Sequence, residues 1–339
     1  MPGLSRRGAV AAALAPALLA ALASCASSPS APAGSGPART LRVGDQKGGA
    51  AQALLDASGQ GKGLPYTISW ASFTSGPPML EAIGAGSVDI GAVGNTPPVF
   101  AGSAHRPVKV VGALRSSEAG DAVLLPKGSA LADVSSLKGR TIAVAQGSSA
   151  HNTLVTLLLK AGLSPADVHL SYLQPPDALA AFTSGKVDAW AVWDPYTAIA
   201  EKAGGHILAT GEQVSAGLAF QVASDSALGD PARSGLVGDY LRRVGAAWRW
   251  AASHQEQWAQ AWSGEAGIPY DVALASVRRT QSTSFEVALD DDAVRSEQQI
   301  VETFAGQKLI PASFAFADFT DRRYNAGLPP STSRTAPAN

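Results

Sequence analysis

Two short loops rich in glycine and small polar residues have the composition of an oxyanion-binding site. The first loop, residues 46–49 (QKGG), and the second, residues 146–149 (QGSS), each follow an apolar run and precede a helix-like run. A helix N-terminus presents free backbone N–H groups and the positive end of the helix dipole, and glycine allows a ligand to approach the backbone closely. Ser148 and Ser149 would add hydroxyl donors. If the loops face each other, each charge-assisted hydrogen bond to a bound anion would contribute about 1.5–3 kcal/mol.

Further polar and aromatic residues follow the other predicted strands. Ligands of open α/β sheets bind beyond the carboxyl ends of the parallel strands, so residues that come directly after strands are candidates. The predicted ligand-binding residues are Gln46, Lys47, Phe73, Ser75, Gly76, Asn95, Thr96, Ser148, Ser149, His151, Trp193 and Asp194. We expect no metal ion, because the five histidines show no metal-ligand spacing. We also expect no catalytic residue and no cofactor.

An internal repeat indicates how these loops are positioned. The segment GSVDIGAVG at 86–94 returns as GKVDAWAVW at 185–193, an offset of 99 residues, and LRVGDQKGGA at 41–50 is matched by TIAVAQGSSA at 141–150, an offset of 100. A repeat at this scale is a sign of repeated architecture. Two similar halves predict two similar lobes with a cleft between them.

The predicted elements of both halves alternate between strand and helix. The near-continuous apolar strands are typical of parallel strands that are covered on both faces. In the first half we expect strands at 41–44, 66–73, 88–93 and 108–114, with helices at 49–57, 76–86 and 96–104, the last capped by Thr96. In the second half we expect strands at 140–145, 168–173, 187–193 and 206–210, with helices at 151–162, 176–185 and 194–204.

The segments at the repeat boundaries and after the second half complete the expected fold. Strands at 121–129 and 217–227 would cross between the lobes and form a hinge. The run 240–264 has its tryptophans at helical spacing, which favours a helix packed on a lobe over an aromatic stacking platform. A further helix is expected at 288–311, where the acidic residues 290–292 suit a helix N-terminus better than a metal site.

Three of the candidate ligand residues also have structural interpretations. Trp193 stands where the first copy has Gly94; it would form either a wall for the apolar part of a ligand or part of the core. Asp194 is most simply a helix cap, since a carboxylate repels anions. His151 is by default a packed or cleft-lining side chain, because the chain has no G-x-S-x-G motif that would support catalysis with Ser149.

The N-terminal segment predicts export and lipid anchoring. Arg6 and Arg7 precede an apolar run at 9–23 that is short for a membrane span but suits a signal peptide. The sequence LASC ends in Cys25, the single cysteine of the chain, and resembles a bacterial lipobox. We expect a signal peptide at 1–25, a flexible tether at 26–40 and a disordered tail at 326–339. Export could follow the general or the twin-arginine route.

The formal net charge of −1 gives no attraction for nucleic acid. With 46% hydrophobic and 16% charged residues, the 339-residue chain can bury a core.

Four segments carry a resemblance to a known family. They are QKGGA, FTSGPPMLEAIGAGSVDIGAVGNTPPVFA, LKGRTIAVAQGSSAHNTLV and VDAWAVWDPY. They resemble the periplasmic aliphatic-sulfonate-binding proteins of ABC importers, over residues 41–223 and more loosely to 311. The wider family includes taurine, nitrate and thiamine-precursor binders with the same fold.

The resemblance implies an α/β fold of the periplasmic-binding-protein type II class. It has two α/β lobes, two crossover hinge strands and C-terminal helices. Lobe 1 would comprise 41–117 plus 218–325, and lobe 2 would comprise 118–217. The sulfonate would meet Gln46, Ser75, Gly76, Asn95, Ser148 and Ser149, with Trp193 near the organic tail. Asp45 departs from the family, which often has tyrosine there; an acid would disfavour a simple alkyl tail or favour an amine-bearing one.

The expected function is that of a lipid-anchored, monomeric receptor on the outer face of the membrane. It would bind a small sulfonate anion and deliver it to the permease subunits of an ABC importer. One alternative is a binder of a thiamine-precursor pyrimidine, with Trp193 and Phe73 stacking on the ring. Another is an enzyme of the same fold; the resemblance implies that such enzymes use a cysteine in the folded body, and this chain has none after Cys25.

Overall fold

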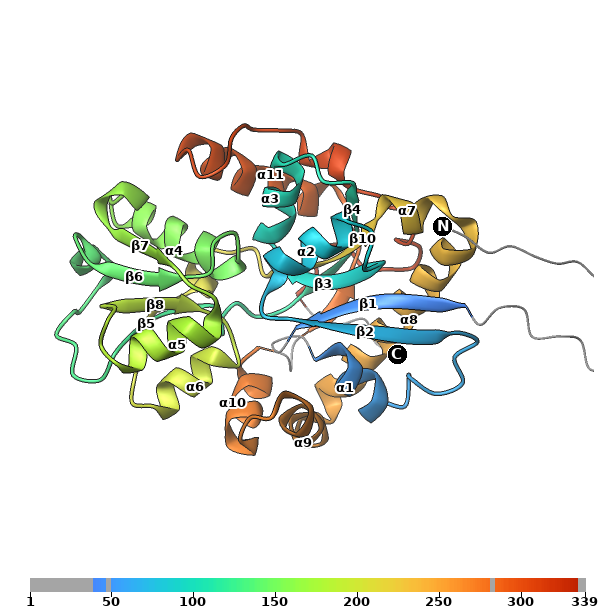
Figure 1. Cartoon of the computed structure of the whole chain (residues 1–339), viewed down its shortest axis with the longest axis horizontal. Coiled ribbons are helices and arrows are strands. Elements are labelled where there is room, and N and C mark those ends of the chain that lie inside the picture. The colour runs from blue at the N-terminus through green and yellow to red at the C-terminus, as the bar shows by residue number, and fades with distance from the viewer. Residues whose placement is uncertain (1–38, 47–49, 281–283, 335–339) are drawn as a thin grey trace, which may run out of the picture. The chain divides into compact units, whose positions relative to one another are not determined.

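Two β-sheets, each at the centre of one lobe, organise the folded part of the chain (Figure 1). The computed structural model describes residues 39–46, 50–280 and 284–334. The predictions for Cys25, for Lys47 and for most of the tether lie outside the described residues. Both lobes are mixed α/β, as the sequence predicts.

The first lobe is built on a six-stranded sheet in the order β11-β4-β10-β3-β1-β2. Its strands are β1 (Thr40–Gln46), β2 (Thr67–Phe73), β3 (Ile90–Gly94), β4 (Val108–Arg115), β10 (Leu218–Ser224) and β11 (Phe285–Val287). Strand β1 pairs in parallel with β2 and β3, whereas β10 runs antiparallel between β3 and β4. The carboxyl ends of β1 and β3 therefore meet at one edge of the sheet.

The second lobe repeats this arrangement in a five-stranded sheet with the order β7-β6-β8-β5-β9. Its strands are β5 (Ala122–Leu125), β6 (Thr141–Val144), β7 (His169–Tyr172), β8 (Ala189–Val192) and β9 (His206–Thr210). Here β5 is the antiparallel strand, between β8 and β9. It takes the place that β10 has in the first sheet.

The two strands expected to cross between the lobes lie inside the sheets instead. All four residues of β5 are buried, and an apolar strand is stable only where sheet neighbours and helices cover it. The crossing is made by residues 116–121 and 211–217. These two segments run side by side, since the Ser116 N–H donates to the Gly217 carbonyl at 3.0 Å and the Gly211 N–H donates to the Asp121 carbonyl at 2.7 Å.

The repeated Val-Asp pair has a structural role. In the first lobe the Arg42 N–H donates to Asp89 Oδ2 at 2.8 Å, and in the second the Thr141 N–H donates to Asp188 Oδ2 at the same distance. Each aspartate thus ties the start of its third strand to the first strand of its sheet. Arg42 and Asp89 correspond to Thr141 and Asp188 at an offset of 99 residues. The strands of the two lobes are therefore equivalent at an offset of 99, although the sequences of the loops at 46–49 and 146–149 align at an offset of 100.

Helices cover both sheets. The first lobe contributes α1 (Ala51–Ala57), α2 (Gly76–Gly84) and α3 (Thr96–Ser103), and the second contributes α4 (Ser149–Lys160), α5 (Pro175–Thr183) and α6 (Tyr196–Lys202). Short 3₁₀ turns lie at Val134–Leu137, Pro165–Asp167, Gly211–Gln213 and Phe316–Phe319.

Two of the predicted helix caps are shifted by one or two residues. Asn95, and not Thr96, is the N-cap residue of α3. Helix α6 begins at Tyr196, with Asp194 just upstream of the cap residue Pro195. Asp194 Oδ1 still accepts the Ala198 N–H at 3.2 Å, so its predicted capping role holds at a shifted position.

The C-terminal region wraps around the first lobe and reaches the second. It forms α7 (Asp225–Gly229), α8 (Pro231–Ser253), α9 (Gln255–Ala266), α10 (Tyr270–Arg279) and α11 (Asp291–Gly306). Helices α8 and α9 pack on α1, α10 packs on α9 and on α6, and α11 packs beside α3 (Figure 1). No helix within the described ranges has the length and apolar character to cross a membrane.

The predicted helix over 240–264 is in fact two helices that meet at His254. Trp258 and Trp262 are fully buried and their rings stack at 5.8 Å, while Trp248 meets Trp258 edge-on. The tryptophans are therefore core side chains. The predicted helix at 288–311 begins at Asp291, and Asp290 caps it by accepting the Ala293 N–H at 3.0 Å.

Candidate ligand-binding site

A cavity of about 180 Å³ lies between the lobes, at the edge where β1 and β3 end and α4 begins. The first crossing segment, residues 116–121, borders it, as do the first residues of β10. Its lining comprises Gln46, Gly76, Ala92, Val93, Gly94, Pro97, Leu114, Ser116, Ser117, Glu118, Gly120, Asp121, Ser148, Ser149, Trp193, Asp194, Leu218, Ala219, Trp248, Thr280 and Ser284. The lining therefore draws on both halves of the repeat and on the C-terminal helices.

Six of the predicted ligand residues line this cavity: Gln46, Gly76, Ser148, Ser149, Trp193 and Asp194. The side chain of Gln46 is oriented by its Nε2, which donates to the Ala92 carbonyl at 2.9 Å. Trp193 is half-buried and packs on the core of the second lobe as well as lining the cavity. Trp193 is therefore part of the core and of the cavity wall, and its contact with a ligand stays a prediction.

The N-terminus of α4 borders the cavity and could supply donors to an anion. Ser148 is the N-cap: its Oγ accepts the His151 N–H at 3.3 Å and donates its own proton to the Ala145 carbonyl at 2.7 Å. That hydroxyl is therefore occupied locally, contrary to its predicted role as a ligand donor. The N–H groups of Ser149 and Ala150 are the first two of the helix and have no intrahelical acceptor. The backbone N–H groups therefore remain as donors, since the Ser149 hydroxyl hydrogen-bonds to Asp121.

The difference between the repeat copies at Gly94 is explained by the close approach of the lobes. A Cβ atom at Gly94 would lie 2.7 Å from Ser149 Cβ, across the cleft. Side-chain carbons cannot approach so closely, so only glycine lets the start of α4 meet the end of β3. Trp193, at the equivalent place in the second lobe, has no such restriction and extends into the cavity wall.

Ser75, Asn95 and Thr96 are buried, and they hold the site together rather than line it. Ser75 Oγ donates to Gln174 Oε1 at 2.8 Å, and Gln174 occupies the equivalent position of the second copy. Thr96 Oγ1 donates to Asn95 Oδ1 at 2.7 Å. Asn95 Nδ2 in turn donates to Ser215 Oγ, in the crossing segment, at 3.4 Å.

His151 is fully buried and is not among the cavity-lining residues. Its ring contacts Phe100 and Phe304 of the first lobe and Tyr172 of the second. Its Nδ1 accepts the Gly147 N–H at 3.2 Å, and burial lowers its pKa to about 4. His151 is therefore a neutral packing residue at the lobe interface.

Two other predicted features lie apart from the cavity. Phe73 is half-buried at the end of β2 and packs on the first-lobe core. Asp45 accepts the N–H groups of Gln46 at 2.8 Å and Gln52 at 3.1 Å. Its carboxylate thus connects the end of β1 with the first turn of α1, and it is absent from the lining.

The sequence reasoning missed two acids in the first crossing segment, Glu118 and Asp121. Burial raises the pKa of Asp121 to about 7, with the Asp194 charge adding to the rise and hydrogen bonding from Ser149 opposing it. Burial and the Asp121 charge raise the pKa of Glu118 well above its usual range. The only signal in the sequence was a pair of acids among small residues at a repeat boundary.

Asp194 is the third acid that lines the cavity, and it pairs with Arg279. Burial raises the pKa of Asp194 to about 6, although Arg279 opposes that rise. Arg279 Nε lies 3.8 Å from Asp194 Oδ2, and Arg279 also pairs with Glu201. One guanidinium therefore serves two carboxylates.

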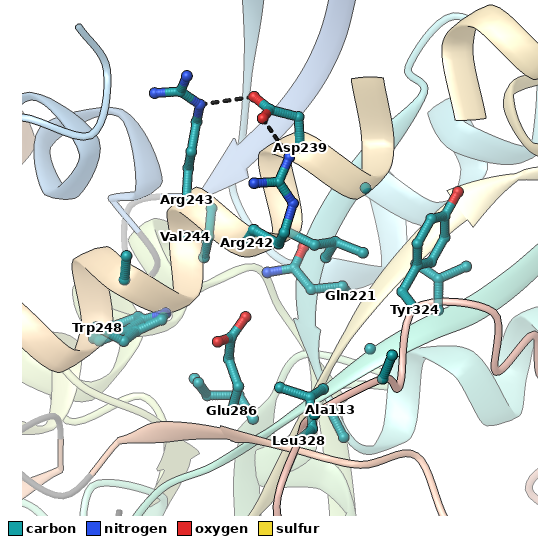
Figure 2. A pocket seen from close by; sticks show the side chains of 18 of the residues that line it. Ala113, Gln221, Asp239, Arg242, Arg243, Val244, Trp248, Glu286, Tyr324 and Leu328 are labelled. Carbon is teal, nitrogen blue, oxygen red and sulfur yellow. Dashed lines mark hydrogen bonds and ion pairs between the residues drawn. The ribbon is translucent and has the colours of Figure 1, made fainter. Parts of the chain in front are cut away.

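A second and larger cavity, of about 1010 Å³, lies within the first lobe (Figure 2). It is bounded by α8, by β4 and β10, and by the chain around Tyr324, and contains none of the predicted ligand residues. Glu286 faces it and pairs with Arg249 at 3.1 Å; burial raises the pKa of Glu286 to about 7. Leu114 and Trp248 border both cavities.

Comparisons with known proteins agree with this architecture. Residues 38–262 match the model of the NMT1-like family. A protein of Escherichia coli (strain K12) that is named as an aliphatic sulfonates-binding protein is 32% identical over 274 residues, which cover 80% of this chain and 85% of that protein.

Solved structures show the same fold. The alkanesulfonate-binding protein SsuA of Xanthomonas axonopodis pv. citri, bound to MOPS, superposes with a TM-score of 0.78 at 31% identity, covering 85% of this chain and all of that one. The periplasmic aliphatic sulphonate binding protein SsuA of Escherichia coli gives 0.73 at 30% identity, covering 84% and 98%. A desulfurization enzyme shares the fold alone, at 15% identity and a TM-score of 0.59 over 84% of this chain and 97% of that one. The chain therefore belongs to the NMT1-like family, in the group of the aliphatic sulfonate-binding proteins.

Proposed function

We propose that this protein is the solute-binding component of an ABC importer and that it binds a sulfonate in the interlobe cavity. The observation that carries the proposal is the N-terminus of α4, whose first N–H groups and the Ser149 hydroxyl border a cavity between two lobes. A sulfonate has three oxygens that accept such donors, and its charge is favoured at the positive end of a helix. Relatives named for sulfonate binding and one solved with MOPS support this ligand class.

The first lobe would add fewer donors. Helix α2 begins at Gly76, but Pro77 and Pro78 follow and have no N–H group. The Gly76 N–H is thus the single donor of the first three α2 positions, and Gln46 also lines the cavity. Trp193 would contact the organic part of the ligand. The cavity volume of about 180 Å³ favours a compact ligand.

The ligand would enter when the lobes separate about the two crossing segments. The contacts of Ser75 with Gln174 and of Gly94 with Ser149 join the lobes directly, as in a closed receptor. Opening would break these contacts and leave each sheet intact, since no strand is shared between the sheets. The closed, loaded monomer would then dock on the permease subunits of the importer. Small-angle scattering should show a smaller radius of gyration with ligand than without; an unchanged radius counts against closure.

We further propose that Cys25 is lipidated and holds the receptor on the outer face of the membrane. The lipobox-like sequence before Cys25 supports this anchor, and a periplasmic relative supports an extracytoplasmic location. Mass spectrometry of the mature protein should find the N-terminus at a diacylated Cys25, and Cys25→Ser should release the protein from membranes. Membrane retention of Cys25→Ser would contradict the proposal.

Calorimetry with ligand-free protein tests the ligand class. The titrants are ethane-, butane- and octanesulfonate, taurine, nitrate and sulfate, in a buffer without a sulfonate group. We expect at least one sulfonate to bind with a Kd in the micromolar range, which corresponds to about −8 kcal/mol, and nitrate and sulfate to bind more weakly. The absence of binding to every sulfonate at millimolar concentration would reject the proposal.

The alternatives have less support. A stacked pyrimidine was expected to use Phe73 together with Trp193, but Phe73 does not line the cavity. An enzyme with a cysteine nucleophile in the folded body is disfavoured because Cys25 is the single cysteine of the chain. We therefore propose a binding protein and no catalytic activity.

A further inference from the structure

We propose that the ligand is an ω-aminoalkanesulfonate whose ammonium group binds at Asp121 and Glu118. The inference rests on the proposed function, because it assigns the second end of a sulfonate bound at α4. The carboxylates of the crossing segment and of Asp194 border the same small cavity as the α4 N-terminus. A cavity with helix N–H donors at one end and carboxylates at the other matches a zwitterion.

The carboxylates of this cavity have unused capacity to accept hydrogen bonds. Asp121 is only 9% exposed, yet its Oδ2 has no hydrogen-bond partner, and the same holds for Asp194 Oδ2. A buried carboxylate oxygen without a partner is costly and rare in native structures. An ammonium group has three N–H donors in a compact charge, and it would satisfy such oxygens in the loaded receptor.

The charges that face these carboxylates from neighbouring elements are mostly of the same sign. Glu118 lies beside Asp121 on the crossing segment, and Asp194 approaches from the start of α6. Glu297 of α11 lies near Glu118, and burial raises the pKa of both glutamates well above the usual range. The cation of this group is Arg279 of α10, which pairs with Asp194 and Glu201. Above the pKa of Asp121, the ionised Asp121 and Asp194 therefore have one cation beside them, which also pairs with Glu201, and a cationic ligand would balance the remaining negative charge.

The kind of cation follows from the same residues. The described part of the chain holds no group of three or more metal-ligating side chains, so an organic cation fits better than a metal ion. Ser149 stands at the start of α4 and also hydrogen-bonds to Asp121. The anionic and cationic subsites are thus adjacent, which favours a chain of two or three carbons between sulfonate and amine.

The raised pKa values allow one competing explanation. A protonated Asp121 or Glu118 could donate a hydrogen bond to a simple alkanesulfonate and need no amine. The two explanations predict opposite dependence on pH. An ammonium group needs ionised carboxylates and binds best above the pKa of Asp121, whereas a proton donor needs the neutral acid and works best below it.

Matched ligands separate the two explanations. Calorimetry compares taurine with ethanesulfonate and 3-aminopropanesulfonate with propanesulfonate, at pH 8 and pH 6, in buffers without sulfonate. At pH 8 we expect taurine or 3-aminopropanesulfonate, whichever binds with the lower Kd, to bind at least about 10-fold more tightly than its matched alkanesulfonate. This factor is the effect of one charge-assisted hydrogen bond. The preference should shrink at pH 6. Binding of the amine at pH 7 should release protons, measured as a dependence of the heat on the ionisation enthalpy of the buffer.

Variants locate the effect. Asp121→Asn should remove the preference for the amine and leave the binding of the matched alkanesulfonate equal or tighter; Glu118→Gln is the second variant if Asp121→Asn fails to fold. Asp225→Asn and Glu302→Gln are the controls, since both side chains are exposed and lie on α7 and α11 outside the cavity lining. Thermal unfolding verifies that each variant folds.

The outcomes are distinct. Equal binding of amine and alkanesulfonate by the wild type, or equal losses for both ligands in Asp121→Asn, would overturn the inference and leave the sulfonate receptor standing. Tighter alkanesulfonate binding at pH 6 than at pH 8, without an amine preference, would identify the carboxyls as proton donors and also overturn it. If no sulfonate binds at all, both the inference and the proposed function are rejected.

Discussion

Substitution of Gly94 by alanine should weaken ligand binding without weakening the fold. Gly94 ends β3 in the first lobe, and the nearest atom to an added methyl group is Ser149 Cβ, at 2.7 Å, in the second lobe. The backbone of Gly94 does not have the positive φ that would exclude alanine. The new methyl group therefore collides only where the lobes meet, and each lobe can fold around it.

The size of the effect follows from the geometry. Two carbon atoms in contact prefer a separation of about 3.5–4.0 Å, so the start of α4 must retreat by about 1 Å from β3. Such a displacement would break about one of the charge-assisted hydrogen bonds to the anion, which costs about 1.5–3 kcal/mol. The expected loss of affinity is therefore about 10- to 150-fold.

Calorimetry with the tightest-binding sulfonate measures this loss, and thermal unfolding of ligand-free protein measures stability. Gly112→Ala is the matched control: it also adds a methyl group to a strand of the first sheet, but its nearest neighbours would lie at an ordinary 3.6 Å within the same lobe. We expect Gly112→Ala to bind normally. Ser149→Gly removes the opposing Cβ, so Gly94→Ala should cause little further loss in that background. Wild-type affinity in Gly94→Ala would refute the reasoning, as would an equal loss with and without Ser149 Cβ.

Three other predictions follow from particular contacts. Gln174→Ala removes the oxygen that accepts hydrogen bonds across the cleft from Ser75 at 2.8 Å and from Thr74 at 3.0 Å. Calorimetry should show a loss of affinity of about 5- to 100-fold, the value of two neutral hydrogen bonds, while the melting temperature of ligand-free protein stays unchanged. Urea unfolding without ligand should show higher stability at pH 5.5 than at pH 8. The reason is that burial raises the pKa of Asp121 to about 7, so below that pH the folded state holds a proton that the unfolded state has released. Between pH 7 and pH 5.5 this one group adds about 2 kcal/mol to the free energy of unfolding. Asp121→Asn should reduce the difference between the two pH values. Asp89→Ala should lower the free energy of unfolding by about 2–4 kcal/mol, and Asp188→Ala should lower it by about 1 kcal/mol. The reason is that the Asp89 side chain is fully buried against Arg42, whereas 41% of the Asp188 side chain is exposed. Equal losses in urea unfolding would contradict this account.

Local patterns were sufficient to predict the order of the elements. The apolar runs of both halves form the expected parallel strands, and the start of α4 lies where the loop at 146–149 predicts a helix N-terminus. The prediction of one continuous helix over 240–264 was wrong, because the helical spacing of the tryptophans continues across the break at His254. A change of direction between two amphipathic helices leaves little trace in the spacing.

The choice of side chains that face the cavity could not be derived in the same way. Ser75 and Asn95 have hydrogen-bond donors in their side chains, as Ser149 does. Yet they donate to Gln174 and Ser215 and stabilise the contact between the lobes. His151 follows a polar loop but is enclosed by aromatic rings from both lobes. These partners lie far away in the sequence, so their approach depends on how the lobes meet.

The sequence by itself determined the repeat, the two lobes, the family and the helix start at 149, because these depend on residues that are near one another along the chain. Only the tertiary structure decided that Gly94 and Ser149 touch, that Ser148 uses its hydroxyl as a cap, and that Glu118 and Asp121 border the cavity. The physical reason is that the cavity lies between two separately built sheets. Its walls are set by the path of the crossing segments and by the distance of closest approach between the lobes, and neither quantity is encoded in a local pattern.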